Sequence, residues 1–374
     1  MCMKTMSRRN FLRGAAGVAC SLALLRLDGL PPARAAARTR RVSEIPASAE
    51  EIAKDAPLIE ENWQQLTAYK DSIENATLRT QVAGVLENPA PTFLTQYGTG
   101  DAARVYEELR ARGLIDAAKV DTAHLLPPIR DARKSPQPFR TAPGSGYASH
   151  HPYPGGLVTH TTANVSILLG IYETYQKVFG YRVDRDIAVA AEILHDLAKP
   201  YVFAWQADGS SQKEYPIAGQ GAHHVLSLAE SIYRGLPPEV VVAQACAHDH
   251  PGSDADAKQV ESWLLAASIL AGKDIAAYGL LTADGRLRPP VREEGFLVHL
   301  GDHDWVLSSY AASQCTAYLS RYATDRLGIL KDDTKTIHAV RNYVGAQLGY
   351  LRLYAALTES EAAADALTKS VLTK

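Results

Sequence analysis

Residues 190–199 read Ala-Ala-Glu-Ile-Leu-His-Asp-Leu-Ala-Lys, and the fold we expect is built outward from them. The stretch predicts the end of a largely apolar helix, closed by the ionisable pair His195 and Asp196. Burying a carboxylate without a partner costs several kcal/mol, so a cation beside Asp196 is the simplest explanation of the pair.

Apolar residues recur at helical spacing along most of the chain. The predicted helices cover residues 48–69, 74–86, 100–113, 115–125, 157–179, 185–198, 221–234, 237–248, 257–279, 303–323, 333–357 and 359–371. Residues 126–156 are rich in Pro and Gly and predict a long loop, and a small hairpin is expected around Asp284. Because alternating apolar runs long enough for a sheet are absent from the sequence, we predict an all-α protein.

The 12 histidines are concentrated between residues 150 and 250, and they stand on or at the ends of predicted helices. They are grouped as His150 with His151, His160, His195, His223 with His224, and His248 with His250. Imidazole together with carboxylate favours Fe, Mn, Zn or Ni over Mg or Ca. His150 and His151 either flank a cavity from the Pro-rich loop or are exposed loop residues.

Five motifs in order resemble the HD-domain superfamily of metal-dependent phosphohydrolases. They are 150–161 around the first histidine, 193–199 with the His-Asp pair, 215–219 followed by His224, 247–252, and 267–274. The additional histidines are similar to those of the branch that holds 3′–5′ exoribonucleases and HD-GYP phosphodiesterases. This resemblance implies an HD-domain helical bundle with additional N- and C-terminal helices.

The same resemblance implies two divalent transition-metal ions. The first would be held by His160, His195, Asp196 and Asp274. Asp196 would bridge to a second ion held by His224 and His248, with Asp249 as a further candidate. His223 competes with His224, and Asp302 and Asp304 compete with Asp274; a helix N-cap is the other interpretation of Asp302.

Two metals of this kind activate water and stabilise both oxygens of a phosphoryl transfer. Asp196 and Lys199 are therefore the expected catalytic residues, because the Lys199 ammonium can reach phosphate oxygens. A solvated cation at a helix C-terminus is the other interpretation of Lys199. The chain departs from the family where Asp249 replaces the second His of a His-His-Gly motif, and no Gly-Tyr-Pro follows it.

The charge balance bears on the substrate. The formal net charge is −2, but residues 1–35 hold six basic side chains and one acid, so the remainder carries −7. An acidic chain with no recognisable nucleic-acid-binding domain before residue 150 disfavours RNA processing. We expect a phosphohydrolase or phosphodiesterase that acts on a small phosphorylated compound.

Two other functions fit the same motifs. The ligand set also resembles the HD oxygenases, such as myo-inositol oxygenase, in which a mixed-valent di-iron pair activates O2; a distal Asp302 would suit that group. The second alternative is a metal- or ligand-binding protein without catalytic activity.

Residues 7–13, Ser-Arg-Arg-Asn-Phe-Leu-Arg, precede a weakly apolar run over 14–25 and small residues around Ala35. The pattern is typical of a twin-arginine export signal over residues 1–37. It implies passage through the twin-arginine translocase, a periplasmic or secreted mature protein, and metal loading before export. Elsewhere in the sequence no apolar stretch approaches the length of a membrane span.

The signal would be followed by a helical region and loop over 38–149, a metal-binding core over 150–280, and a helical C-terminal extension over 281–374. Cys246 and Cys315 either form a disulfide in an oxidising compartment or are small buried apolar side chains.

Overall fold

The computed structural model describes residues 38–146, 149–289 and 293–374, so the predicted export signal lies outside the described residues. The described chain is predominantly helical, which confirms the all-α prediction. Strands there are limited to four two-residue pieces. β1 (Arg40–Arg41) pairs in parallel with β4 (Leu372–Thr373), and β2 (Pro216–Ile217) pairs antiparallel with β3 (Gln220–Gly221).

The helices fall into three stretches of the chain. The first holds η1 (Val42–Glu44), α2 (Ala49–Lys54), α3 (Pro57–Asp71), α4 (Ala76–Glu87), η2 (Thr92–Gln96), α5 (Asp101–Ala111) and η3 (Phe139–Thr141). The second holds α6 (Gly156–Phe179), α7 (Arg185–Leu194), α8 (Lys199–Val202), α9 (Ala222–Tyr233), α10 (Pro238–Ala245), α11 (Asp254–Leu270), α12 (Ile275–Tyr278) and α13 (Glu294–Gly301). The third holds η4 (Asp302–Asp304), α14 (Trp305–Asp325), α15 (Thr334–Leu348), α16 (Tyr350–Glu359) and α17 (Glu361–Lys369).

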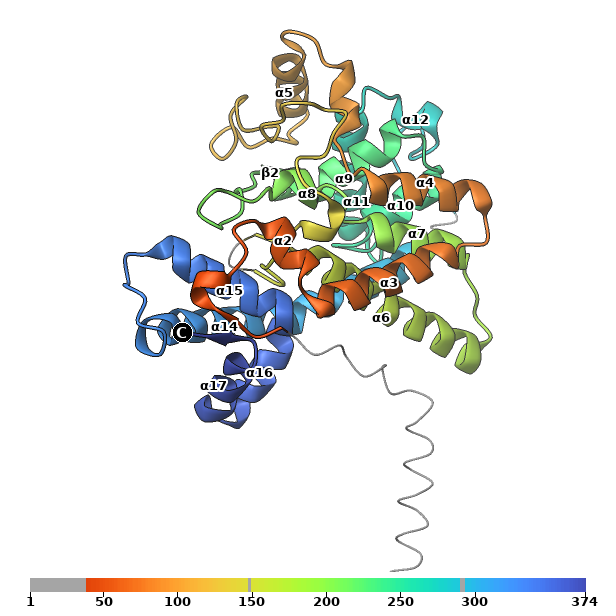
Figure 1. Ribbon diagram of the computed structural model, residues 1–374. Helices are drawn as coiled ribbons and strands as arrows, with labels where there is room; N and C mark the ends of the chain where they lie inside the picture. The colour runs from red at the N-terminus through yellow and green to blue at the C-terminus, as the bar shows by residue number, and fades with distance from the viewer. Residues whose placement is uncertain (1–37, 147–148, 290–292) are drawn as a thin grey trace, which may run out of the picture. The chain divides into compact units, whose positions relative to one another are not determined.

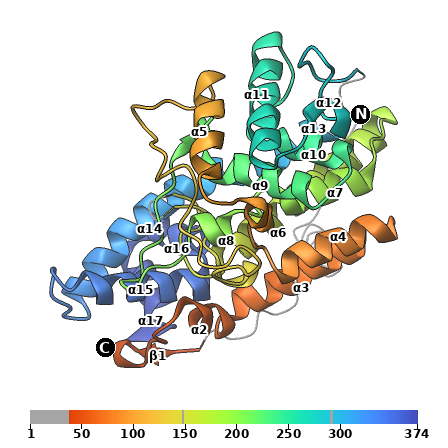
Figure 2. The same cartoon turned by 90° about the horizontal axis from the view of Figure 1, so that it is seen from above.

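The second stretch forms the centre of the packing. α6 packs against α3, α7 and α13, while α9 packs against α10 and α11. Figure 1 shows α3 and α4 in orange beside the green helices α6 and α7, and the blue helices α14 to α17 gathered together. Figure 2 gives the same arrangement from above, with α3 and α4 lying one after the other along α6 and α7.

Local sequence explains where several helices begin. The Asp184 carboxylate caps α7 by accepting from the backbone N–H groups of Asp186 and Ile187, and Asn75 caps α4 in the same way. Such caps satisfy backbone donors that have no partner within the helix. α7 is therefore started by an acid and ended by His195, which places the His-Asp pair at a defined point.

Two hydrophobic clusters make up the core. The larger runs from Leu66 to Val298 and is built on α6, α7, α9, α10 and α11. The smaller joins α2 and the start of α3 to α14, α15 and α16, and it includes the fully buried Tyr153. Leu157, four residues later, belongs to the larger cluster. The short segment around residues 150–156 is thus anchored in both clusters.

Three of the predicted helices are corrected by the structure. Residues 115–125 form turns instead of a helix, because the Asp116 and Asp121 carboxylates accept nearby N–H groups, from Ala118 and His124. The predicted helix 257–279 breaks around Gly272 (φ 62°), and 333–357 breaks at Gly349 (φ 70°), where a left-handed backbone ends the helical run.

The long loop and the hairpin are confirmed. Residues 126–155 form the single turn η3 and otherwise stay irregular where they are described, and Leu281 pairs with Leu287 around the predicted turn. The backbone at the start of α6 is crowded: a Cβ on Gly156 would lie 1.9 Å from the His151 carbonyl oxygen. A glycine is required there for the loop to approach the helix.

Cys246 and Cys315 are both free thiols and both buried, in different hydrophobic clusters. The interpretation as small apolar side chains is confirmed, and the disulfide is not formed. Over the described residues, none of the helices combines the length and the apolar character needed to cross a bilayer.

Candidate metal centre

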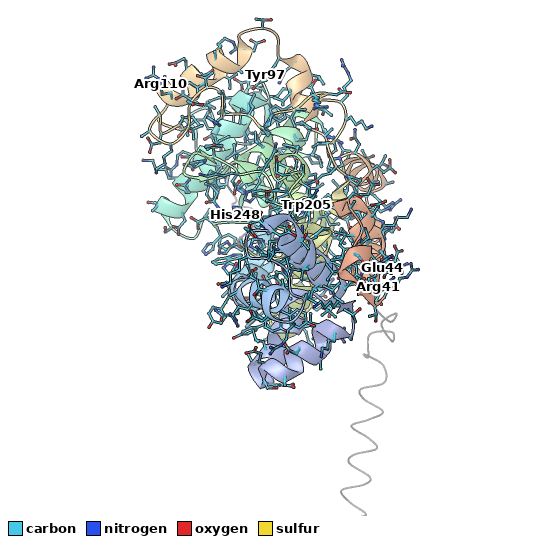
Figure 3. The ribbon with its side chains drawn as sticks, turned by 60° about the vertical axis from the view of Figure 1, so that its left-hand side comes forward. Arg41, Glu44, Tyr97, Arg110, Trp205 and His248 are labelled. Carbon is cyan, nitrogen blue, oxygen red and sulfur yellow. The ribbon has the colours of Figure 1, made fainter. Side chains whose placement is uncertain are left out.

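Histidines and carboxylates from five parts of the chain meet between the two hydrophobic clusters. They come from α6 (His160), the end of α7 (His195 and Asp196), α9 (His223), the bend after α10 (His248) and η4 (Asp302). Figure 3 labels His248, which in that view lies between the green and cyan helices above it and the blue helices below it. The elements that carry these residues are long, capped or packed, so the side chains are held by rigid structure.

One set of donor atoms brings two histidines to the carboxylates of both Asp196 and Asp302. His160 Nε2 lies 3.2 Å from Asp196 Oδ2 and 3.1 Å from Asp302 Oδ1. His195 Nε2 lies 3.1 Å and 3.3 Å from the same two oxygens. All four side chains are buried. Their separation and donor types suit a single divalent transition-metal ion.

A second set uses the remaining oxygens of the same carboxylates. His223 Nε2 lies 3.6 Å from Asp196 Oδ1, and His248 Nε2 lies 3.5 Å from Asp302 Oδ2. Asp196, His223 and His248 offer ligand atoms that all lie within 4.8 Å of one another. The two sets share Asp196, so its carboxylate is placed to bridge two ions.

Hydrogen bonds on the far side of each ring determine which nitrogen faces the cluster. His195 Nδ1 lies 2.6 Å from the Glu192 carbonyl oxygen, and His223 Nδ1 lies 2.7 Å from Glu214 Oε2. His160 Nδ1 lies 3.4 Å from Asp304 Oδ2. These oxygens accept, so each Nδ1 donates to the partner behind it, and Nε2 is the ring nitrogen that faces the cluster. Metal-binding histidines in proteins are oriented in this way.

Several buried atoms of the cluster have no hydrogen-bond partner among the described residues: His195 Nε2 and both oxygens of Asp196. Buried polar atoms in native proteins are almost always satisfied. Asp196 Oδ2 is in ionic contact with Lys199, but His195 Nε2 and Asp196 Oδ1 remain unsatisfied, and a buried set of histidine and carboxylate donors fits one or more divalent metal ions.

The charges and hydrogen bonds of these side chains strongly shift one another's pKa values. Burial disfavours a charge on His160, but its hydrogen bonds to Asp196, Asp302 and Asp304 raise its pKa to about 10. Burial also opposes ionisation of His195, yet the charges of Asp196 and Asp302 hold its pKa well above the ordinary value. Burial opposes the Asp302 carboxylate as well, but the charge of His195 keeps its pKa well below the usual range. A metal ion would displace these protons, because ligation requires neutral imidazole.

Lys199 is buried, and its ammonium contacts the Asp196 carboxylate and the carbonyl oxygen of Gly144. It begins α8, so the interpretation as a solvated cation at a helix C-terminus is wrong. His150 lies close to it, with 3.5 Å between His150 Nε2 and Lys199 Nζ. Burial lowers the pKa of His150 well below the ordinary value. A buried ammonium group therefore stands at the edge of the carboxylate cluster.

Asp304 is hydrogen-bonded to His151 and also lies beside the Nδ1 atom of His160. The Asp304 carboxylate lies 2.7 Å from His151 Nε2, while His151 Nδ1 lies 2.8 Å from the Tyr153 hydroxyl. His151 is buried and adopts φ 45°, a left-handed conformation that costs a non-glycine residue of order 1–3 kcal/mol. His150 and His151 are thus not exposed loop residues, and Asp304 orients His160.

The structure corrects two members of the expected ligand set. His223, and not His224, joins the second donor set; the His224 ring stacks on His248 with centroids 4.4 Å apart, and neither of its nitrogens has a hydrogen-bond partner among the described residues. Asp274 is exposed and caps α12 by accepting from Ala277 N–H. Asp302 takes the place expected for Asp274, and the capping role considered for Asp302 belongs to Asp274.

Other expected residues are placed as follows. His160, His195, Asp196 and His248 lie together as the sequence predicts. Asp249 accepts from the His250 N–H and stands outside the donor sets found among the described residues. Sequence reasoning missed the supporting residues Glu214, Glu192 and Asn164, whose Nδ2 donates to Asp302 Oδ1 at 3.0 Å. A single acid or amide in a long chain carries no spacing signal, so only the contact reveals it.

A cavity of about 230 Å³ opens over the cluster. Its wall is lined by Ser149, His150, Lys199, Gln220, His223, Ala247, His248, His299, Asp302, His303, Trp305 and Ser309. Small-molecule sites commonly occupy about 300–1,000 Å³, so this cavity suits a compact ligand.

Comparison with known proteins found a partial similarity to an enzyme. No protein-family model matches the chain, and no solved structure matches it. Over 102 residues, which are 27% of this chain, the sequence is 36% identical to the dihydroneopterin 2′,3′-cyclic phosphate phosphodiesterase of Methanocaldococcus jannaschii. The matched segment spans about 40% of that relative's length. A cluster of histidine and aspartate side chains that could bind metal thus stands in a chain that is similar, over about a quarter of its length, to part of a phosphodiesterase.

Proposed function

We propose that this protein is a metal-dependent phosphohydrolase that cleaves a phosphodiester in a small molecule. The observation that carries the proposal is the convergence of His160, His195, Asp196 and Asp302 on one point, with each imidazole Nδ1 tied behind. His223 and His248 would hold a second ion through Asp196. The motif order of the HD-domain superfamily supports the same assignment.

Divalent ions bound here would supply an activated water and would neutralise charge on the phosphate. The chain's own contribution is positional. Asp196 and Asp302 each offer one oxygen to either donor set, which fixes the distance between the two sets. Glu214 and Asp304 keep His223 and His160 in the tautomer that directs Nε2 inward.

Lys199 is the residue that would contact the substrate phosphate. It lines the cavity and is buried, so its charge acts at low effective dielectric on the oxygens that become more negative in the transition state. Its contacts with Asp196 and Gly144 hold the ammonium in one position before substrate arrives. It would act by electrostatic stabilisation, with no proton transfer required.

The partial relative supports a diester over a monoester. The substrate in that enzyme's name is a 2′,3′-cyclic phosphate, and hydrolysis of a cyclic diester opens one P–O bond. A cyclic phosphate is compact, as the cavity requires.

The test is hydrolysis by the full-length protein after metal analysis. Samples loaded with Mn²⁺, Zn²⁺ or Fe²⁺ are offered 2′,3′-cyclic, 3′,5′-cyclic and linear phosphodiesters and phosphomonoesters. We expect turnover of a diester that is abolished by chelation and by Asp196→Asn, and reduced about 100-fold or more in kcat by Lys199→Met. Full metal occupancy with no cleavage of any ester would overturn the proposal.

A second candidate function is an HD-type mixed-valent di-iron oxygenase. The observation that favours it is Asp302, the distal aspartate expected for that group, which occupies the cluster in place of Asp274. An iron-loaded sample that shows a mixed-valent EPR signal and takes up O2 only with substrate would favour the oxygenase. Absence of O2 uptake beside diester cleavage would dismiss it.

Export is proposed on the sequence pattern alone. The pair Arg8 and Arg9 stands in a twin-arginine context, and an export route for folded proteins would allow metal loading in the cytoplasm. We expect replacement of Arg8 and Arg9 by Lys to trap the precursor inside the cell, read by fractionation and immunoblotting. Unchanged secretion of this variant would contradict the export proposal.

A further inference from the structure

Five aromatic rings form a ladder: four stand on α13, η4 and the start of α14, and the fifth, His250, comes from the loop after α10. Phe296 faces His250 with centroids 5.0 Å apart, His250 faces His299 at 4.8 Å, and His299 faces His303 at 4.5 Å. Trp305 continues the row 6.1 Å from His303. His299, His303 and Trp305 line the cavity that also holds Lys199 and Asp302. The metal centre thus shares its cavity with an aromatic wall that the proposed cleavage does not use.

Trp305 is the exposed end of this ladder. It is 45% exposed, although a large aromatic side chain gains most by burial. An exposed indole in the wall of a cavity offers a flat apolar face on which a ring can stack.

The two histidines present hydrogen-bond acceptors. His299 Nδ1 lies 3.1 Å from the Ala247 carbonyl oxygen, and His303 Nδ1 lies 2.5 Å from the His299 carbonyl oxygen. A carbonyl only accepts, so both Nδ1 atoms donate, and Nε2 is the ring nitrogen left for a ligand. Burial lowers the pKa of His299, which favours the neutral ring. Within the described part of the chain, neither Nε2 atom is engaged in a hydrogen bond.

The cavity volume limits what this wall can bind. About 230 Å³ leaves room for one compact ring system beside a phosphate group, and a polymer would have to remain largely outside. Acceptors beside a stacking surface select a ring that carries N–H groups on its edge.

We propose that Trp305, His299 and His303 form the subsite for the organic part of the substrate, and that this part is a flat nitrogen heterocycle with N–H donors on its edge. Guanine and the pterins are heterocycles of this class. The inference rests on the proposed phosphohydrolase function, because the same cavity must hold the ester.

The experiment compares three cyclic diesters on the metal-loaded full-length protein: guanosine 2′,3′-cyclic phosphate, neopterin 2′,3′-cyclic phosphate and the ringless glycerol 1,2-cyclic phosphate. Trp305→Ala is expected to raise KM for a ring substrate about tenfold or more while changing kcat little, and to leave glycerol 1,2-cyclic phosphate unaffected. The guanosine and neopterin arms distinguish the two sources of the ring.

Two variants isolate the contributions. His303→Phe keeps a ring but removes the acceptor, so KM for the ring substrates should rise, and His303→Asn should recover part of the loss. Tyr310→Ala is the matched control, because Tyr310 is 58% exposed on the same helix and does not line the cavity. Equal effects of Trp305→Ala on ring and ringless substrates would overturn the subsite.

A binding measurement separates this inference from the proposed function. Calorimetry with guanosine and neopterin, which lack a phosphate, reports on the ring subsite alone. Binding that is lost in Trp305→Ala would support the subsite even if no ester is cleaved. Cleavage of the ringless diester without binding of either ring would retain the hydrolase and refute the subsite.

Discussion

At the residue scale, the function of the candidate site depends on the state of a few side chains. Asp196 contributes one oxygen to each donor set, and His160 and His195 direct Nε2 at it because their Nδ1 atoms are engaged elsewhere. The contact behind each histidine matters as well, since a free imidazole would lose its orientation.

Asp302 and Asp274 provide a matched comparison. Asp302→Asn should lower metal stoichiometry or affinity strongly, because a buried charged oxygen of the first donor set is lost. Asp274→Ala should leave metal binding unchanged and cost about 1 kcal/mol of stability through loss of a helix cap. Metal analysis and calorimetric titration of both variants check this. Metal loss in Asp274→Ala alone would restore the ligand set expected from the sequence.

A supporting contact is also testable at this scale. Asp304→Asn should weaken metal binding about 10–100-fold while helix content stays the same, because His160 Nδ1 loses its carboxylate partner. Metal affinity measured with a competing chelator gives the result. An unchanged affinity would show that Asp304 serves only His151.

At the element scale, what positions the site is the approach of a loop to a helix. The segment around residues 150–156 carries Tyr153 into one hydrophobic cluster and leads into α6, whose Leu157 belongs to the other. η4, from much later in the sequence, contributes Asp302 and Asp304. Close backbone contact at Gly156 makes this meeting possible.

Two glycines of α6 are predicted to respond in opposite directions to alanine. Gly156→Ala should destabilise the protein by about 1–3 kcal/mol, since its Cβ would meet the His151 backbone. Gly170→Ala, whose Cβ meets nothing within 4 Å, should stabilise it by about 0.5–1 kcal/mol. Urea unfolding with equal m-values measures both. Stabilisation by Gly156→Ala would mean that the loop does not pack against α6 as described.

At the scale of the whole molecule, the site couples stability to pH and to metal. The folded pKa of His160, about 10, lies above its ordinary value of 6.5. Its stabilising contribution is therefore complete below pH 6.5 and is lost as the pH rises toward 10. Asp302, with a lowered pKa, contributes above the ordinary carboxylate range and loses that contribution as the pH falls.

The metal-free protein should consequently be most stable in weakly acidic solution and should lose thermal stability from about pH 6.5 to about pH 9. Added metal should stabilise it more as the pH rises through the same window, because ligation needs neutral imidazoles. Thermal unfolding with chelator and with Mn²⁺ or Zn²⁺ at several pH values measures both slopes. His160→Gln should flatten the metal-free slope, and an unaltered slope in this variant would assign the pH dependence to other groups.

Much of this protein could be predicted from its amino-acid order. Helical spacing and capping residues act over a few neighbours, so the all-α class, the long irregular loop and the His-Asp pair at the end of α7 follow from local patterns. The break at Gly349 and the turns held by Asp116 also have local causes, but helical periodicity hides them.

The choice of Asp302 over Asp274, and of His223 over His224, has no local signal, because both members of each pair suit a helix end or a helix face. Packing alone separates them: η4 is brought beside α6 between the two clusters, while Asp274 is left at the surface, and Glu214 turns His223 inward. A ligand set is a property of distances in space, and chain positions about 140 residues apart, such as His160 and Asp302, acquire a distance only when the whole chain folds.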